Sequence, residues 1–253
     1  MVMLPFIATH SDDSERPDGR TAIVTGCSRG IGAAIAHRLR YCGYSVIEVQ
    51  RTSPHVPADL GQWKAVPERW AAAVELAPRG VDLLVLNAGA SREGAFIDVE
   101  PDDVTYCFHL NVFGALLFAR EALRYWTARK RPGHIVMIGS QAALPGAREA
   151  DVLYAASKGA MHATVGPLAR EYGPLVRVNC VAPGDVATDT ELALAAKARC
   201  GLKPECAWRE VAARSALGRW VRADEVADAV LFLERCTAMT GAIINISGGT
   251  SIH

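Results

Sequence analysis

The sequence has no long apolar run, no net charge, no internal repeat and no low-complexity linker. A membrane-spanning helix needs about 20 consecutive apolar residues, and no segment of this chain approaches that length. The 27 basic residues balance the 27 acidic ones, which argues against nucleic acid as a partner. At 253 residues the chain is long enough for one α/β domain with a sizeable core. We therefore expect a single domain that binds neither membranes nor nucleic acid.

Paired cysteine motifs are also absent. The seven cysteines contain no CxxC pair and lie at positions 27, 42, 107, 180, 200, 206 and 236. An odd, scattered set is typical of reduced thiols in a cytoplasmic protein, and it predicts neither a disulfide framework nor a metal site. The opening MVMLPFIATH is apolar but short, lacks a basic leading region and precedes the polar SDDSERPDGR. Residues 1–17 are therefore predicted to form a flexible N-terminal extension and not a secretory signal.

Short apolar segments alternate with longer segments of helical period along residues 18–253. Predicted strands cover 21–25, 44–49, 81–86, 134–139, 176–182 and 242–247, and predicted helices cover 30–42, 102–126, 154–172 and 223–236. Parallel neighbours need connections about as long as these helices. The pattern predicts an α/β fold of the Rossmann type, one doubly wound parallel sheet with helices on both faces. Residues 185–220 form a long helical insertion and are a candidate lid over a site.

Three glycines lie where the first predicted strand passes into the first helix, in TGCSRGIG (25–32). A glycine inside an element costs roughly 0.5–1 kcal/mol relative to alanine, so Gly26, Gly30 and Gly32 require either a tight turn or a ligand close to the backbone. This turn falls at the carboxyl edge of the sheet, where open α/β sheets bind ligands. Backbone N–H groups at a helix N terminus suit a pyrophosphate. A tight turn with helix-to-strand packing explains the same glycines, so both explanations stay open.

Six motifs follow one another in an order and at spacings that resemble the short-chain dehydrogenase/reductase family. They are TGCSRGIG (25–32), NAG (87–89), Asn111 in HLNVFGALL, Ser140 in IGSQAALPG, YAASK (154–158) and VAPGDVAT (181–188). The match covers residues 18–250. The resemblance implies an enzyme that interconverts a secondary alcohol and a ketone by hydride transfer with a nicotinamide cofactor. We expect it to act as an NADPH-dependent ketoreductase.

The resemblance assigns the chemistry to four residues, Tyr154, Lys158, Ser140 and Asn111. Tyr154 and Lys158 are four residues apart and share a helix face. A tyrosine with a reference pKa of about 10 needs positive charge nearby to act at neutral pH, and Lys158 supplies it. In the family the tyrosine exchanges a proton with the substrate oxygen, the lysine also holds the nicotinamide ribose, and the serine hydrogen-bonds that oxygen. Asn111 resembles the asparagine that links the lysine to solvent through water.

NADP is the expected cofactor, in preference to NAD. The second strand ends in VIEVQR, so Gln50 and Arg51 stand where an acidic residue would select NAD. Arg29 and Arg51 supply two guanidinium groups suited to a 2′-phosphate. Two alternatives stay open. Both arginines are also explained as solvated surface residues, and Glu48 is close enough in sequence to form an ion pair with one of them. The resemblance implies a cofactor site made of Gly26, Ser28, Arg29, Gly30, Ile31, Gly32, Arg51, Asp59, Leu60, Asn87, Ala88, Gly89, Tyr154, Lys158, Pro183, Gly184, Val186 and Thr188.

The substrate pocket is expected around Arg92, Gln141 and Arg148. Relatives that oxidise dihydrodiols of benzoate type carry an arginine at an offset similar to that of Arg148, so a carboxylate-bearing substrate is one hypothesis. The alternative is a solvated surface arginine that Glu149 or Asp151 neutralises.

Two departures from the family pattern affect this pocket. Ser140 and Tyr154 are 14 positions apart, one more than is common, which predicts a one-residue insertion in AREADVL. Gly139 takes a place often filled by a second serine. Neither change removes a reactive group, but substrate inference from relatives is weakened.

Two other functions are alternatives to the ketoreductase. One is an NAD-linked dihydrodiol dehydrogenase acting on a carboxylate-bearing substrate. The other is a non-catalytic protein that senses dinucleotides, although a sensor has no need of Ser140, Tyr154 and Lys158 together.

Self-association is expected as well. The helical segments 104–126 and 154–172 carry more apolar surface than one sheet face can cover, and in similar proteins these two helices form a four-helix dimer contact. We expect a homotetramer or homodimer that acts on a small-molecule carbonyl or alcohol. The alternative is that both helices are simply buried within the monomer.

Overall fold

The computed structural model describes residues 19–91, 95–144, 152–188 and 204–250. Within these residues, seven parallel strands form one sheet in the order β3-β2-β1-β4-β5-β6-β9. The strands are β1 (Thr21–Thr25), β2 (Ser45–Gln50), β3 (Val56–Pro57), β4 (Leu83–Leu86), β5 (Gly133–Ile138), β6 (Val176–Pro183) and β9 (Ile243–Ile246). The strand order reverses between β1 and β4, so the prediction of a doubly wound parallel sheet is confirmed.

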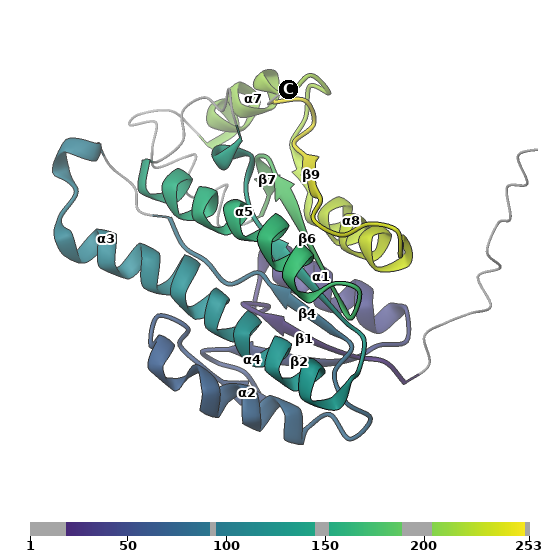
Figure 1. Cartoon of the computed structure of the whole chain (residues 1–253). Helices are drawn as coiled ribbons and strands as arrows, with labels where there is room; N and C mark the ends of the chain where they lie inside the picture. The colour runs from purple at the N-terminus through teal and green to yellow at the C-terminus, as the bar shows by residue number, and fades with distance from the viewer. Residues whose placement is uncertain (1–18, 92–94, 145–151, 189–203, 251–253) are drawn as a thin grey trace, which may run out of the picture.

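Helices cover both faces of the sheet (Figure 1). They are α1 (Gly30–Tyr41), α2 (Val66–Glu75), α3 (Pro101–Phe108), α4 (Ala115–Arg129), α5 (Val152–Tyr172), α7 (Pro204–Arg214) and α8 (Ala223–Arg235), with short 3₁₀ helices at 63–65, 96–98 and 141–143. α2, α4 and α5 pack on one face around Trp70, Phe118 and Trp126, whereas α1 and α8 pack on the other around Ile35 and Val230. Because both faces are covered, every residue of β1 and β4 is buried, and these strands are continuous apolar runs.

The predicted helix over 102–126 is divided into three parts. Between α3 and α4, the segment His109–Gly114 is a π-helical turn, a form that frequently marks functional sites. Gly114 lets this turn approach the chain that follows β3, because a Cβ there would lie 2.5 Å from the Leu60 carbonyl oxygen. The turn therefore places Asn111 close to the carboxyl edge of the sheet.

The strand β3 was not predicted, and its connection to β2 over residues 51–55 is unusually short. Two side chains of this connection bond the β2 edge directly. The Ser53 hydroxyl donates to the Glu48 carbonyl oxygen (2.7 Å), and His55 Nδ1 accepts from the Glu48 N–H (3.1 Å). These side chains satisfy backbone groups that a longer neighbouring strand would otherwise pair.

The segment 185–220 contains β7 (Val186–Ala187) and α7, and β7 pairs with β8 (Val221–Arg222). Trp208 on α7 stacks on Trp220, with ring centroids 4.8 Å apart and an interplanar angle of 16°. Residues 189–203 lie outside the described residues, as do residues 1–17. The lid and the N-terminal extension therefore stay predictions.

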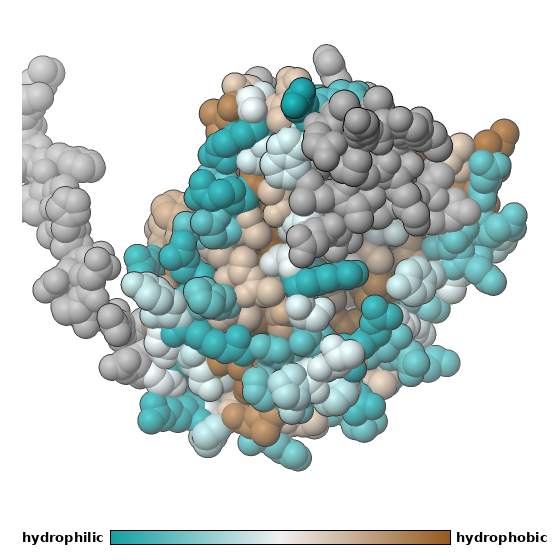
Figure 2. Space-filling model, turned by 180° about the vertical axis from the view of Figure 1, so that it is seen from behind, coloured by the Kyte–Doolittle hydropathy of each residue, from teal (hydrophilic) through white to brown (hydrophobic). Residues whose placement is uncertain are grey.

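Figure 2 shows the molecule from behind, where hydrophilic side chains are spread over much of the visible face and apolar areas lie between them and at the outline. Among the residues that the structure describes, no helix is both long enough and apolar enough to cross a membrane.

Candidate active site

The carboxyl ends of the parallel strands bring the predicted site residues to one edge of the sheet. The glycine turn follows β1, the NAG segment (87–89) follows β4, and Ser140 follows β5. Helix α5 contributes Tyr154 and Lys158 to the same edge. Segments far apart in the sequence therefore form one site, at the place where open α/β sheets bind ligands.

Gly26 and Gly32 are required by the packing of the turn itself. Gly26 has φ +65°, and a Cβ there would lie 2.7 Å from Ala88 Cα. A Cβ on Gly32 would lie 2.3 Å from the Gly26 carbonyl oxygen and 2.5 Å from Asn87 Nδ2. The Asn87 amide donates to the carbonyl oxygens of Gly26 (2.7 Å) and Thr25 (3.1 Å). The tight-turn explanation therefore holds for both glycines, and Asn87 holds the turn in place.

Gly30 opens the N terminus of α1 toward Thr188. It has φ +58°, and a Cβ there would lie 3.3 Å from Thr188 Cγ2. Arg29 at the N-cap makes no capping hydrogen bond with its side chain, and the first turn contains no acidic residue. In this part of the described chain, neither a capping side chain nor an acidic residue of the first turn therefore offsets the partial positive charge of the first N–H groups of α1. Such a helix N terminus suits an anion. Ser28 is exposed, and Ile31 packs partly against the core.

Lys158 lies buried between Tyr154 and the end of β5. Its Nζ donates to the Ile138 carbonyl oxygen (2.9 Å) and lies 5.6 Å from the centre of the Tyr154 ring, and the residue is 4% exposed. A Cβ on Gly89 would lie 3.3 Å from Nζ, so the amine reaches the NAG segment. Burial disfavours the ammonium form and lowers the pKa of Lys158 to about 8. At neutral pH the amine is still mostly protonated and places positive charge beside the tyrosine.

Asn111 ties the NAG segment to α5. Its Nδ2 donates to the Ala90 carbonyl oxygen (2.8 Å) and to the Ser157 hydroxyl (2.9 Å), and its Oδ1 accepts from the Ala90 N–H (2.9 Å). These bonds give Asn111 a structural task that the sequence did not reveal. The water path from Lys158 to solvent stays a prediction.

Ser140 lies beside α5 with its hydroxyl able to donate. Its Oγ accepts from the Ala142 N–H (3.1 Å) and so caps the short helix over 141–143. A hydroxyl that accepts one hydrogen bond still has its own proton to give. Gln141 follows in the same short helix and is half-buried. The hydrogen bond from Ser140 to a substrate oxygen stays a prediction.

The segment from Pro183 to Thr188 closes the site from β6. The Gly184 N–H donates to the Ile246 carbonyl oxygen (3.0 Å), and a Cβ on Gly184 would lie 2.8 Å from Ser247 Cα. Val186 is buried, with its backbone paired to β8. Close packing against β9 therefore accounts for the glycine in this segment.

The two arginines predicted to bind the 2′-phosphate are not neutralised by Glu48. That carboxylate pairs with Arg40 (2.6 Å) and accepts from Gln50 Nε2 (3.1 Å). In the described ranges, neither Arg29 nor Arg51 forms an ion pair, which removes one of the two alternatives raised by the sequence.

Arg51 and Asp59 line one cavity of about 280 Å³, together with Arg69 from α2. Asp59 Oδ1 accepts from the Gly61 N–H (2.9 Å). Leu60 is a buried core residue, so its side chain points into the protein. Arg69 is a further candidate for the cofactor site that the sequence did not reveal. In the sequence it is marked only by its position in the first turn of α2.

Of the three predicted substrate residues, only Gln141 is placed. Arg92 and Arg148 lie outside the described residues. Among the side chains that the structure does describe, no group of three or more His, Cys, Asp or Glu residues is arranged to hold a metal ion.

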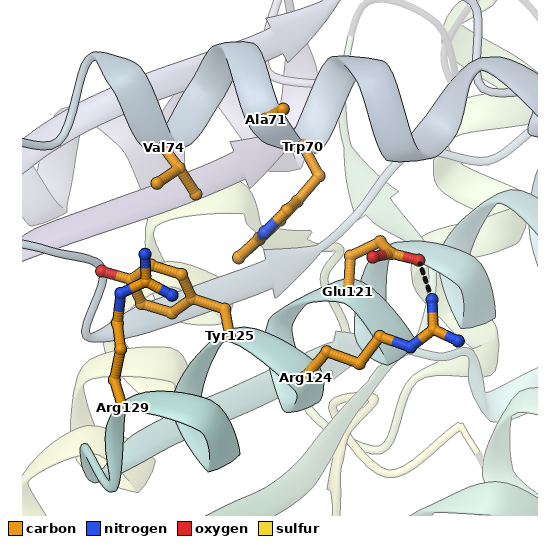
Figure 3. Close-up of a pocket in the computed structure, with 7 residues that line it drawn as sticks. All are labelled: Trp70, Ala71, Val74, Glu121, Arg124, Tyr125 and Arg129. Carbon is orange, nitrogen blue, oxygen red and sulfur yellow. Dashed lines mark hydrogen bonds and ion pairs between the residues drawn. The ribbon is translucent and has the colours of Figure 1, made fainter.

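A second depression of about 350 Å³ lies between α2 and α4 and contains none of the predicted site residues. It is lined by Trp70, Ala71, Val74, Glu121, Arg124, Tyr125 and Arg129 (Figure 3). The Arg129 guanidinium lies 4.1 Å from the centre of the Tyr125 ring, and Arg124 pairs with Glu121 (3.2 Å). The charged groups of this groove therefore contact one another or the Tyr125 ring.

Comparisons with known proteins agree with this geometry. The family model for short chain dehydrogenase matches residues 20–199. The chain is 31% identical to L-xylulose reductase from Bos taurus, over 91% of this chain and 96% of that one. A short chain dehydrogenase from Burkholderia cenocepacia in complex with NADP aligns with a TM-score of 0.80 and 31% identity, over 93% of this chain and 99% of that one. A 3-oxoacyl (acyl-carrier-protein) reductase from Agrobacterium tumefaciens with NADP bound aligns with a TM-score of 0.84 and 31% identity, over 96% and 99%. The chain belongs to the short-chain dehydrogenase family of oxidoreductases.

Proposed function

We propose that this chain reduces a ketone on a small molecule to the secondary alcohol, and catalyses the reverse reaction, with NADPH as the hydride donor. The observation that supports this proposal most directly is the position of the buried Lys158 amine, which lies near the Tyr154 ring and the NAG segment at the sheet edge. Two relatives, L-xylulose reductase and the 3-oxoacyl reductase, are named for reductions of carbonyl groups, which supports the direction.

The residues at this edge fit a dinucleotide that carries a 2′-phosphate. The uncapped N terminus of α1, with Gly30 and Thr188 beside it, would hold the pyrophosphate. Arg29 and Arg51 would hold the 2′-phosphate through charge-assisted hydrogen bonds. The Burkholderia and Agrobacterium structures both contain NADP. When bound, NADPH supplies the hydride.

The chain's own residues supply the proton and the orientation of the substrate. Tyr154 would donate its hydroxyl proton to the substrate oxygen as that oxygen gains charge. Lys158 would favour the resulting phenolate, because positive charge stabilises the ionised form of a nearby tyrosine. Ser140 would donate a hydrogen bond to the same oxygen and hold the carbonyl in place. Asn111 would keep the NAG segment in register with α5.

A screen of carbonyl compounds with NADPH, and of alcohols and diols with NADP⁺ or NAD⁺, tests the proposal through nicotinamide absorbance. We expect reduction of at least one ketone, and a loss of about 10²- to 10⁴-fold in kcat for Tyr154→Phe without loss of NADPH binding. Tyr41→Phe is the matched control, because Tyr41 is exposed on α1. Tight NADPH binding with no turnover in any assay would favour the sensor. Preference for NAD⁺ and a carboxylated diol would favour the dihydrodiol dehydrogenase.

We also propose that the protein is a homodimer or homotetramer in the cytoplasm. α3 and α4 follow one another end to end through the turn His109–Gly114, and α5 lies beside them (Figure 1). Tyr106 on α3, Phe113 in the turn and Val152 on α5 expose apolar surface. Cys27, Cys42, Cys107, Cys180 and Cys236 are free thiols, as expected in a reducing compartment. Light scattering coupled to size-exclusion chromatography tests the assembly, and Phe113→Arg should shift it toward the monomer. A wild-type monomer at high concentration would contradict the proposal.

A further inference from the structure

Two side chains of α5 hold the segment that carries Ser140. Lys158 Nζ donates to the Ile138 carbonyl oxygen (2.9 Å), and His162 Nε2 accepts from the Ser140 N–H (3.4 Å). His162 is one helical turn beyond Lys158 and two beyond Tyr154, so the three side chains share one face of the helix. The segment that leaves β5 is therefore held at two points by one rigid element.

His162 fills the space that a side chain at position 139 would need. A Cβ on Gly139 would lie 2.1 Å from His162 Nε2 and 2.8 Å from Cys180 Sγ. The Gly139 N–H is itself bonded to the Val181 carbonyl oxygen (2.8 Å), which limits any outward shift of the backbone. The glycine and the histidine therefore form a matched pair, and the residue that departs from the family pattern at 139 makes room for the ring.

The imidazole of His162 is neutral and acts as an acceptor. Burial, with a further contribution from the positive charge of Lys158, lowers the pKa of His162 to about 4. A neutral imidazole has one N–H and one acceptor nitrogen. Because Nε2 faces the Ser140 N–H, the ring proton belongs on Nδ1.

We propose that His162 is a positioning residue, which accepts the Ser140 N–H and thereby fixes the direction in which the Ser140 hydroxyl meets the substrate oxygen. This inference rests on the proposed function, since that function gives the hydroxyl its task. The backbone of Ser140 is extended (φ −162°, ψ 148°), and its Oγ also caps the next turn. A rotation of this residue would turn the hydroxyl in another direction, and small displacements of a positioning group are costly for rate.

A double-mutant cycle between positions 140 and 162 tests the inference with NADPH and a ketone found in the screen. His162→Leu keeps a similar bulk but removes the acceptor, and we expect kcat to fall about five- to tenfold, as for one lost hydrogen bond, with the KM for NADPH unchanged. His162→Gln retains an acceptor and should restore most of the activity. In a Ser140→Ala background, His162→Leu should change kcat by less than about twofold, because no hydroxyl remains to be positioned. His37→Leu, at an exposed position of α1, is the matched control.

Equal losses from His162→Leu with and without the Ser140 hydroxyl would overturn the inference, since the ring would then act by packing alone. No loss in either background would overturn it as well. Activity that His162→Gln fails to restore, while both proteins fold and bind NADPH, counts against an acceptor role.

A second measurement does not depend on turnover. In ¹⁵N NMR of the full chain at neutral pH, we expect an acceptor-type Nε2 and a protonated Nδ1 for His162, assigned with the His162→Gln variant. The Ser140 amide signal should shift in His162→Leu and stay in place in His37→Leu. If no ketone were reduced while these signals were present, the proposed function would fail and the contact that orients Ser140 would stand. A proton on Nε2 would overturn the inference even in an active enzyme.

Discussion

Removing the carboxylate of Glu234 should destabilise the protein in a pH-dependent way. This side chain is buried at the end of α8, where it accepts from the Tyr44 hydroxyl (3.1 Å) and His134 Nδ1 (2.6 Å) and pairs with Arg20. Burial lowers the pKa of His134 and keeps the ring neutral. Asn179 Nδ2 donates to His134 Nε2 (3.1 Å), so the ring proton lies on Nδ1 and points at the carboxylate. Glu234 therefore satisfies donors from several distant elements at once.

The size of the effect follows from the pKa of this carboxyl group. Burial alone would raise the pKa of Glu234, but the hydrogen bond from His134 and the charge of Arg20 outweigh burial and lower the pKa to about 2. One pKa unit is worth about 1.4 kcal/mol, so the difference from the ordinary value of 4.5 corresponds to about 3 kcal/mol. Because the folded-state pKa is depressed, this stability is present above the unfolded pKa and is lost as the pH falls through the folded value.

Urea unfolding of wild type and Glu234→Gln, followed at a series of pH values, measures the effect. At neutral pH we expect the free energy of unfolding of the variant to be lower by about 3 kcal/mol, and we expect the gap to close as the wild-type carboxylate becomes protonated. Glu75→Gln, at an exposed position of α2, should stay within about 0.5 kcal/mol of wild type throughout. A gap that does not change with pH would refute the reasoning, because a protonated glutamic acid would then serve as well as the carboxylate.

Three further predictions concern the site. Arg51→Leu should raise the KM for NADPH by about tenfold or more and leave the KM for NADH nearly unchanged, because only NADPH carries the 2′-phosphate; equal changes for both cofactors would contradict this. The rate of ketone reduction should fall as the pH rises through about 8, where the Lys158 ammonium is lost, and a pH–rate profile of Lys158→Met should lack that limb. Gly139→Ser should lower the melting temperature, because its Cβ would lie 2.1 Å from His162 Nε2. Adding His162→Ala to Gly139→Ser should recover part of that loss in a thermal melt.

The features that could be predicted from the sequence are local ones. The apolar runs that became β1 and β4 and the glycine spacing before α1 are properties of a few consecutive residues, and each predicts an element directly. The strand β3 could not be found this way, because two residues carry no period. The π-helical turn over His109–Gly114 was equally hidden, since six residues cannot distinguish it from the α-helices on either side.

The features that could not be predicted depend on which distant residues meet. Asn87 matched the cofactor motif, yet its amide bonds the turn at Gly26. Arg69 shares a cavity with Arg51 only because α2 packs beside the end of β2. His162 was one polar residue among several on α5, and only the path of the chain after β5 shows that it meets Ser140. Spacing therefore identified the reactive groups, whereas the groups that hold them required the fold.

The strand β5 connects the two polar clusters of the protein. Near its amino end His134 bonds Glu234, and at its carboxyl end Lys158 bonds Ile138 while His162 bonds Ser140. Between these ends its residues are buried, apolar and covered on both faces, so polar side chains can be satisfied only near the ends of the strand. A strand held at both ends leaves Ser140 little freedom to slide relative to α5. We therefore expect Glu234→Gln to loosen the position of Ser140 as well, although Glu234 lies at the opposite edge of the sheet and contacts no described residue of the predicted site.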